Sequence, residues 1–148
     1  MHARQQIRDA IATTLDGLTT TGSNVFKSRV YNTRDQVLPC LLIYTLTDEI
    51  GEVQSIGYPR IVDRDMTLAV EARVKATSGF DATVDTICEE VEAALATDLT
   101  LGGLTRDILH ASTQIAYTAD GDKPYGSALM SFNIRYRVKE DAPGTPIA

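Results

Sequence analysis

The side chains best suited to catalysis in this chain are two histidines, two cysteines and a set of carboxylates. His110 alternates with Leu109 and Ala111, so in a strand it is expected on the more polar face. A catalytic triad also needs a nucleophile and an orienting carboxylate within reach, and no local motif supplies them. We therefore expect an exposed strand histidine without a catalytic role. An enzyme would need His110 to meet Asp63 or Asp65 from elsewhere in the fold.

Both cysteines stand in apolar stretches, Cys40 within 38–46 and Cys88 beside Ile87 and Val91. A single cysteine in such a setting usually behaves as a small buried hydrophobic residue. Glutamates follow Cys88 closely, and negative neighbours disfavour a reactive thiolate. We expect two buried, reduced thiols. Two cysteines and two distant histidines are not a zinc ligand set, so no metal is expected.

The carboxylates are spread over predicted strands and loops. Asp63 and Asp65 are two positions apart and share a strand face with Glu71. Other acids stand in expected loops, namely Asp48, Glu49, Asp120 and Asp122. The pattern of a calcium-binding loop is absent, and the LGGL segment at 101–104 lacks the Lys-Ser/Thr that follows in a phosphate loop. We expect solvated surface acids, and the sequence indicates no cofactor.

The composition is that of one ordinary globular domain. The chain has 148 residues, 43% hydrophobic and 23% charged, which is enough to bury a core. The formal charge of −6 and a pI near 4.8 argue against specific nucleic-acid binding, which needs a surplus of Lys and Arg on one face. The first residues lack a signal-peptide pattern, and no apolar run reaches membrane-spanning length. We expect a protein made in a cytosol, with no membrane partner.

The N-terminal half predicts a helix followed by strands. Apolar residues recur at the spacing of one helical face over 7–18, and a strand is expected at 25–31. The run at 38–46, LPCLLIYTL, is apolar on both faces, which is typical of a strand covered on both sides. It is the candidate central strand. The polar segment 47–60 then predicts a long hairpin connection.

The C-terminal half predicts a strand, a helix and two closing strands. Strict alternation of apolar and polar residues at 65–76 indicates a strand with one face on a core. A helix is expected at 80–97, with Ser78 as its N-cap. The closing strands are expected at 109–117, where the odd-numbered residues share one face, and at 128–138.

These elements predict an α+β fold with a mixed, mainly antiparallel sheet and two helices packed on one face. We expect a single domain over residues 1–138, with a turn at 119–124. Residues 139–148 are rich in proline and glycine, and we expect them to form a flexible C-terminal tail.

Unexplained apolar residues gather in the segment 47–60. Ile50, Val53, Ile56 and Tyr58 give it more apolar side chains than a solvated loop needs, and long loops of compact domains are often functional. Charged neighbours and polar strand faces complete the candidate protein-interaction residues: Asp48, Glu49, Arg60, Arg73, Arg135 and Arg137. Opposite charges on such faces can set the register of a subunit interface.

Read together, several segments resemble the tail terminator proteins of long-tailed bacteriophages (the minor tail protein U type) and their equivalents in gene transfer particles. They are IRDAIATTLDGLTTTGSNVFKSRVY, LPCLLIYTLTDEI, RIVDRDMTLAVEARVKA, DTICEEVEAALATD, LGGLTRDI and GDKPYGSALMSFNIRYRV. The resemblance covers nearly the whole chain and includes no catalytic signature.

The resemblance implies a small subunit that closes into a ring, typically a homohexamer. In that family the ring caps the tail tube, ends its polymerisation and offers a surface to the head-completion or neck protein. The implied partners are copies of this chain, the tail tube protein and a neck protein, and DNA can pass through such a ring without specific binding. The implied location is the virion tail or neck, assembled in the host bacterial cytoplasm. The segment 47–60 is then expected to face the lumen or the tube.

Three alternatives stay open at the level of sequence. Another head–tail connector or a tail-completion subunit would share the same general features. A small cytosolic enzyme would need a pocket that assembles His110 with Asp63 or Asp65. A ligand- or peptide-binding module would use an open edge of the sheet.

Overall fold

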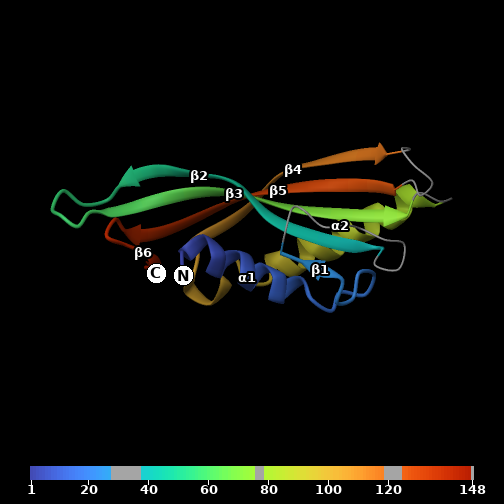
Figure 1. The fold of residues 1–148 in the computed structure, drawn as a ribbon, viewed down its shortest axis with the longest axis horizontal. Coiled ribbons are helices and arrows are strands. Elements are labelled where there is room, and N and C mark those ends of the chain that lie inside the picture. Colours follow the sequence, from blue (N-terminus) through green and yellow to red (C-terminus); the bar gives the residue numbers. More distant parts are fainter. Residues whose placement is uncertain (28–37, 76–78, 119–124, 148) are drawn as a thin grey trace.

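A computed structural model of the chain describes residues 1–27, 38–75, 79–118 and 125–147 (Figure 1). In chain order its elements are α1 (Ala3–Leu15), β1 (Val25–Phe26), β2 (Cys40–Val53), β3 (Ile61–Lys75), α2 (Phe80–Ala96), η2 (Leu101–Gly103), β4 (Asp107–Thr118), β5 (Tyr125–Lys139) and β6 (Ala142–Pro146). The strands form one sheet in the order β1-β2-β3-β5-β4, and β6 pairs with the end of β5.

The sheet is mixed and mostly antiparallel. Among the described strands, β1 runs parallel to β2 and every other pair is antiparallel. Both helices lie against the same face of the curled sheet, which we call the helix side; the opposite face is the open face (Figure 1). The predicted α+β fold is therefore confirmed. The candidate central strand, β2, lies between β1 and β3, and the middle strand of the order is β3.

Helix α1 follows from the predicted amphipathic pattern. Ile7, Ile11 and Leu15 recur at a spacing of four and are fully buried against the sheet. His2 caps the first turn, because its Nδ1 accepts a hydrogen bond from the backbone N–H of Arg4 at 3.1 Å.

Helix α2 confirms the expected helix at 80–97. Its buried side chains are Val84, Ile87, Cys88, Val91 and Leu95. The N-cap is Gly79, whose φ of +86° suits glycine, and no side chain caps the helix there. The predicted N-cap, Ser78, lies outside the described residues.

The main core lies between the helices and the inward residues of β3 and β5. These residues face each other across the two strands in the pairs Met66–Ile134, Leu68–Phe132, Val70–Met130 and Ala72–Ala128. Full burial of a large apolar side chain stabilises a fold by about 1.5–3 kcal/mol. A smaller cluster on the open face contains Leu42, Tyr44 and Ala69. The apolar run of β2 is thus buried on both faces from Cys40 to Tyr44, as predicted, whereas Leu46 at its end is exposed.

The first half of the segment 47–60 is strand rather than loop. β2 continues to Val53, which lies opposite Val62 of β3, so the chain turns within 54–60. Figure 1 shows the resulting hairpin reaching past the start of α1 at one end of the molecule. The expected connection therefore consists of the end of β2, paired with β3, and a turn at 54–60.

Leu46 is a β-bulge in β2. Thr45 lies opposite Leu68 and Thr47 lies opposite Thr67, so Leu46 has no counterpart on β3. Side chains alternate along a strand, and the extra residue therefore reverses which positions of β2 face the helix side beyond it.

A second bulge, at Ala111, divides β4. His110 lies opposite Phe132 and Ser112 lies opposite Ser131, which leaves Ala111 unmatched. The prediction that the odd-numbered residues of 109–117 share a face is therefore wrong. Leu109 is on the open face, whereas the odd-numbered residues after the bulge are on the helix side.

Strand β6 shows that the predicted irregular tail at 139–148 is wrong as far as Pro146. The strand pairs with the end of β5, and the backbone N–H of Ile147 donates to the carbonyl of Arg137 at 2.7 Å. The side-chain amide of Gln6 donates to the carbonyl of Gly144 at 2.6 Å, which fastens β6 to the start of α1.

Two predicted elements fall partly or wholly outside the described residues. The strand expected at 25–31 is described as β1, and residues 28–31 are among those not described. The turn expected at 119–124 is likewise outside. Neither described helix is long and apolar enough to cross a membrane.

Candidate interaction surface

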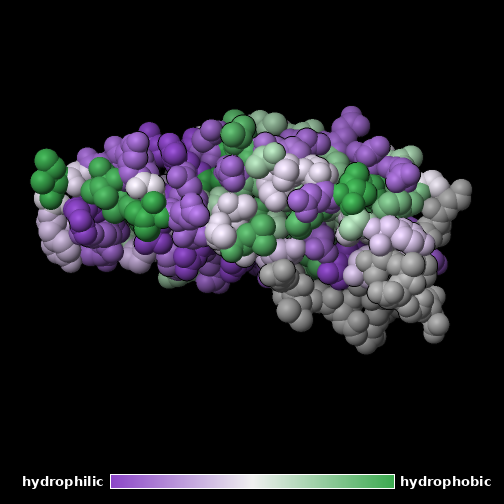
Figure 2. Space-filling view, turned by 90° about the horizontal axis from the view of Figure 1, so that it is seen from above, coloured by the Kyte–Doolittle hydropathy of each residue, from purple (hydrophilic) through white to green (hydrophobic). Residues whose placement is uncertain are grey.

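Among the described residues, the two most exposed large apolar side chains, Ile56 and Tyr58, lie on the β2–β3 hairpin. We call residues 48–66 the hairpin arm and residues 54–60 the arm tip. Ile56 is fully exposed and Tyr58 is 81% exposed, while Ile50 and Val53 are at least half exposed. Figure 2 shows the corresponding hydrophobic atoms at the end of the molecule that the hairpin forms. The structure thus brings the four predicted apolar residues together on one projecting element.

Three ion pairs join the hairpin arm to β5 and the turn after it; we call them the β3–β5 charge ladder. Arg135 Nε lies 2.9 Å from Asp65 Oδ1, and Arg137 Nε lies 2.6 Å from Asp63 Oδ1. Both pairs are directly opposite in the strand register. The third pair lies just before β3, where Arg60 Nη2 is 2.9 Å from Glu140 Oε2. The predicted opposite charges therefore pair inside the subunit.

The Asp63–Arg137 pair is the buried ion pair of the β3–β5 charge ladder. Asp63 is only 5% exposed, so the expectation of a solvated surface acid is wrong for this residue. Its carboxylate also accepts a hydrogen bond from the Gln54 side-chain amide at 2.9 Å. The hydrogen bond from Arg137 lowers the pKa of Asp63, with burial opposing it. The ladder connects the arm tip to the sheet through side chains as well as backbone. Because the Arg137 guanidinium already pairs with the Asp63 carboxylate, it is not available to bind an anionic group of a partner.

Asp48 is buried at the root of the arm, and the expectation of a solvated loop acid is wrong. Its Oδ2 accepts hydrogen bonds from the Tyr136 hydroxyl at 2.6 Å and from Arg4 Nη1 at 2.9 Å, and Arg64 Nη1 lies 3.4 Å away. The side chain of Asp48 is 4% exposed. Burial and the hydrogen bond to Asp48 raise the pKa of Tyr136. The bulge at Leu46 turns Asp48 to the helix side, where these partners lie.

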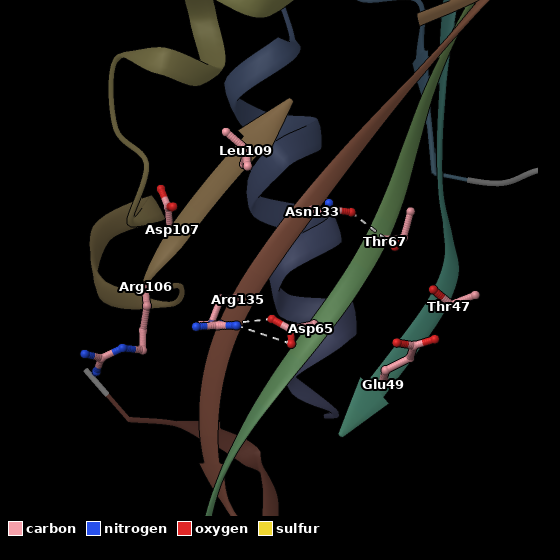
Figure 3. Close-up of a pocket in the computed structure, with 9 residues that line it drawn as sticks. All are labelled: Thr47, Glu49, Asp65, Thr67, Arg106, Asp107, Leu109, Asn133 and Arg135. Carbon is pink, nitrogen blue, oxygen red and sulfur yellow. Dashed lines mark hydrogen bonds and ion pairs between the residues drawn. The ribbon is translucent and has the colours of Figure 1, made fainter. Parts of the chain in front are cut away.

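A polar hollow of about 640 Å³ lies on the open face beside the arm (Figure 3). Glu49 stands on its β2 side and Arg106 on its β4 side, with the Asp65–Arg135 pair between them (Figure 3). Its lining contains both carboxylates and guanidinium groups, so its charges largely compensate one another. Glu49 and Arg60 of the arm and Arg135 of β5 are exposed.

Arg73 lies at the other end of β3, away from the arm. Its side chain is 17% exposed and pairs with Glu71. The guanidinium carbon also stands 5.2 Å from the ring centroid of Tyr125. The structure does not bring Arg73 together with the other candidate interaction residues.

His110 faces the helix side, and the prediction that it lies on the polar face is wrong. Its ring stacks on Phe132 with centroids 4.9 Å apart, and its Nδ1 lies 2.9 Å from Glu92 Oε1 of α2. Asp63 and Asp65 lie on the opposite face of the sheet. The dispersed enzyme site that would combine His110 with either aspartate therefore does not form.

The two cysteines are buried, as predicted. Burial raises the pKa of the Cys40 thiol to about 11. The pKa of Cys88 is raised by burial first and by the carboxylate of Glu92 second. Over the ranges that the structure describes, no group of three or more His, Cys, Asp or Glu side chains is placed to hold a metal ion.

The outer edge of β4 is an exposed surface that was not predicted from the sequence. Residues 111–117 are exposed on both faces, although the strand carries Ile115 and Tyr117. The available signal was the absence of charged residues between Asp107 and the end of the strand, which is unusual for a solvated edge.

No model of a known protein family matches the chain, and no curated protein matches it significantly.

Proposed function

We propose that this protein is a structural virion protein, a tail terminator that forms a ring on the tail tube of a phage-like particle. The observation that carries the proposal is the hairpin arm, which holds Ile56 and Tyr58 in solvent at the end of a braced two-stranded element. Exposed apolar side chains on a fixed support are typical of protein–protein contact sites. The resemblance of the sequence to tail terminator proteins supports the same role.

The side-chain contacts that hold the arm against the sheet favour this role. A mobile loop loses conformational freedom when it binds, and that entropy loss weakens binding. Here the β3–β5 charge ladder and the hydrogen bonds of Asp48 fix both the middle and the root of the arm. The apolar tip can then bind a partner with only a small loss of conformational entropy. We assign the arm to a contact inside the tail, with the tube protein or with the neighbouring subunit.

The proposed partners are further copies of this chain in a ring, typically six, the tail tube protein, and a head-completion or neck protein. The ring ends tube polymerisation and joins the tube to the head. Another connector or tail-completion role belongs to the same class of proposal and differs in position within the particle.

Location in the particle tests the proposal. Tailed particles would be purified from bacteria that carry this gene, labelled with antibody against the protein, and imaged by electron microscopy. We expect one cluster of label at the head-proximal end of each tail, and tails of uncontrolled length when the gene is deleted. Particles that lack the protein, together with unchanged tail length in the deletion strain, would reject the proposal. Label at another fixed position would assign the connector or completion role.

A further inference from the structure

The outer edge of β4 is exposed along most of its length. The strand spans Asp107–Thr118, and over the described residues no strand pairs with its outer side. Every residue from Ala111 to Tyr117 is exposed. Natural edges are usually protected by charges, prolines, bulges or short length. After Asp107 this strand contains no Asp, Glu, Lys, Arg or Pro, and its bulge at Ala111 is its main irregularity. The edge can therefore accept one further strand.

An acidic groove of about 620 Å³ lies between this strand and α2. Its lining includes Asp85, Glu89 and Glu92 of α2 and Thr113 and Ile115 of β4. All three carboxylates are exposed. Glu92 pairs with His110, whereas Asp85 and Glu89 make no hydrogen bond or ion pair within the described part of the chain. Residues 80–105, which form α2 and the turn after it, contain six acidic residues and no Lys or Arg. The groove therefore carries an excess of negative charge.

A smaller apolar hollow of about 110 Å³ adjoins the groove and shares Glu92 with it. The rest of its lining includes Leu95 and Leu99 of α2 and the turn after it, Ile108 and His110 of β4, and Phe132 of β5. The His110 ring stacks on Phe132 and bonds to Glu92 at 2.9 Å, which fixes one wall of the hollow. Such a hollow suits one aliphatic side chain with polar groups at its rim.

From these observations we infer that the β4 edge binds an extended segment of a partner protein that carries an apolar side chain and, on the same face, Lys or Arg side chains. In strand addition the main-chain hydrogen bonds supply affinity, and pockets for alternate side chains supply specificity. Here the hollow beside His110 takes the apolar side chain, and the carboxylates of Asp85 and Glu89 attract the basic ones. The inference concerns this edge alone and does not depend on the proposed ring.

The charge of the groove favours a basic partner over a second copy of this chain. Two β4 edges that pair about a two-fold axis form one continuous sheet, so both α2 helices lie on the same side of the junction. Asp85 and Glu89 of each copy would then approach those of the other, and like charges at an interface disfavour binding. The formal charge of −6 on each chain adds to this repulsion.

The pairing of β4 with β5 shows how a regular strand follows the bulge. Ile108, His110, Thr113 and Ile115 lie opposite Ile134, Phe132, Met130 and Ala128 of β5. These β5 residues are two positions apart throughout, and all belong to the core on the helix side. A regular strand on the outer edge can follow β4 in the same way. The side chains that it places beside His110, Thr113 and Ile115 would therefore also be two positions apart.

Peptides with this spacing test the inference by calorimetric titration of the full-length protein. Ser-Thr-Leu-Thr-Lys-Thr-Lys-Thr places one leucine and two lysines on one face, and Thr-Lys-Thr-Lys-Thr-Leu-Thr-Ser does so in the opposite order. We expect one of the two, according to the strand direction, to bind with a Kd below about 1 mM. The matched peptides with glutamate in place of lysine should not bind. Failure of both lysine peptides, or equal binding of the glutamate peptides, would overturn the inference.

Variants of the groove locate the binding. Asp85→Asn with Glu89→Asn should weaken binding of the lysine peptide about tenfold, the effect of losing two exposed ion pairs. Asp16→Asn with Asp141→Asn is the matched control, because it removes the same charge at two exposed positions outside the groove. The control should change the affinity by less than about twofold, since distant surface charges are screened by salt. Equal weakening by both double variants would show general attraction to an acidic protein and reject the site.

Backbone methylation of the peptide tests for strand pairing. Alternate N–H groups of a strand point to the same edge, so one alternate set faces β4 and the other faces solvent. We expect N-methylation of one set to abolish binding and N-methylation of the other set to leave it unchanged. Equal loss or equal retention with the two sets would reject strand addition. Self-association of the protein that excludes the peptide would assign the edge to a second copy, which overturns the inference as well.

Discussion

Asp48 accepts a hydrogen bond of 2.6 Å from the hydroxyl of Tyr136, a residue 88 positions further along the chain. The contact joins the root of the hairpin arm to β5 on the helix side of the sheet. Arg4 reaches the same carboxylate oxygen from α1, so three elements meet at one buried acid. The orientation of the arm therefore depends on a polar cluster as well as on the β2–β3 ladder.

Replacing Tyr136 with phenylalanine tests this cluster. The change removes the hydroxyl and keeps the ring, and it leaves Asp48 with one fewer donor in a buried position. We expect the free energy of unfolding to fall by about 1–3 kcal/mol, the usual effect of losing a buried hydrogen bond to a charged group. Urea unfolding followed by circular dichroism measures it. Tyr58→Phe, at the exposed arm tip, should change stability by less than about 0.5 kcal/mol; equal effects of the two variants would contradict the role of Asp48.

The arm tip can be altered without affecting the core. Ile56→Ser with Tyr58→Ser removes two exposed apolar side chains, so the monomer should keep its unfolding midpoint within error. Assembly should weaken, seen as fewer complete particles and abnormal tail lengths by electron microscopy. The conservative pair Ile56→Val with Tyr58→Phe should assemble like the wild type. Normal particle yield and tail length from the serine variant would exclude a contact role for the tip.

Val70 is a sensitive position in the core. It is fully buried on β3 opposite Met130, so Val70→Asp places a carboxylate where no partner exists among the described residues. The cost of burying an unpaired charge exceeds the total stability of about 5–15 kcal/mol that a domain of this size has, unless the site opens to water. We expect unfolded or aggregated protein, shown by loss of the far-UV signal and of a thermal transition. Ile50→Asp, on the exposed part of β2, should fold normally.

The Asp63–Arg137 pair predicts a specific dependence of stability on pH. The pKa of Asp63 is lowered in the folded state, mainly by the hydrogen bond from Arg137. The contribution of this carboxylate is therefore fully present above its unfolded pKa of about 3.9, and it is lost as the pH falls through the lower folded-state value. Asp63→Asn should destabilise the protein at pH 7, and the difference from wild type should shrink as the pH approaches 3. A difference that stays constant between pH 7 and pH 3 would show that the charge of Asp63 contributes nothing.

Gly126 of β5 allows a close contact that another residue would prevent. A Cβ built at this position would lie 1.8 Å from a ring carbon of Phe80, the first residue of α2. Gly126→Ala should therefore displace the ring and lower the free energy of unfolding by about 1–3 kcal/mol. Gly57→Ala at the arm tip has open space around its Cβ and serves as the control. Equal stability of the two variants would show that the ring of Phe80 moves away without cost.

Period-two alternation predicted β3 and β5 well because both strands are regular over fifteen residues and carry one apolar face each. The helical stripes predicted α1 and α2 for the same reason. The alternation predicted for β4 failed because Ala111 adds one residue to the strand. A bulge depends on the partner strand and leaves no period of its own in the sequence, so the face of His110 was predicted incorrectly.

The candidate surface was predictable in part. The exposed apolar residues of the arm could be located because they stand in a polar segment between two strands. Asp48 could not be recognised as buried, because its partners Tyr136 and Arg4 come from distant parts of the chain. The tail also differed from expectation, since β6 forms by pairing with β5 despite its Pro and Gly content. Such a strand at the end of a sheet is stabilised by its neighbour rather than by its own propensity.

The bulge at Ala111 has a consequence for how this protein behaves at high concentration. A bulge bends a strand and increases its twist, and a twisted edge accepts a flat row of further strands poorly. Loss of the single codon for Ala111 would leave the two faces of β4 as they are and straighten the edge. We expect the deletion to lower the solubility of the protein, through growth of fibre-like aggregates of stacked sheets, before it impairs folding of the monomer.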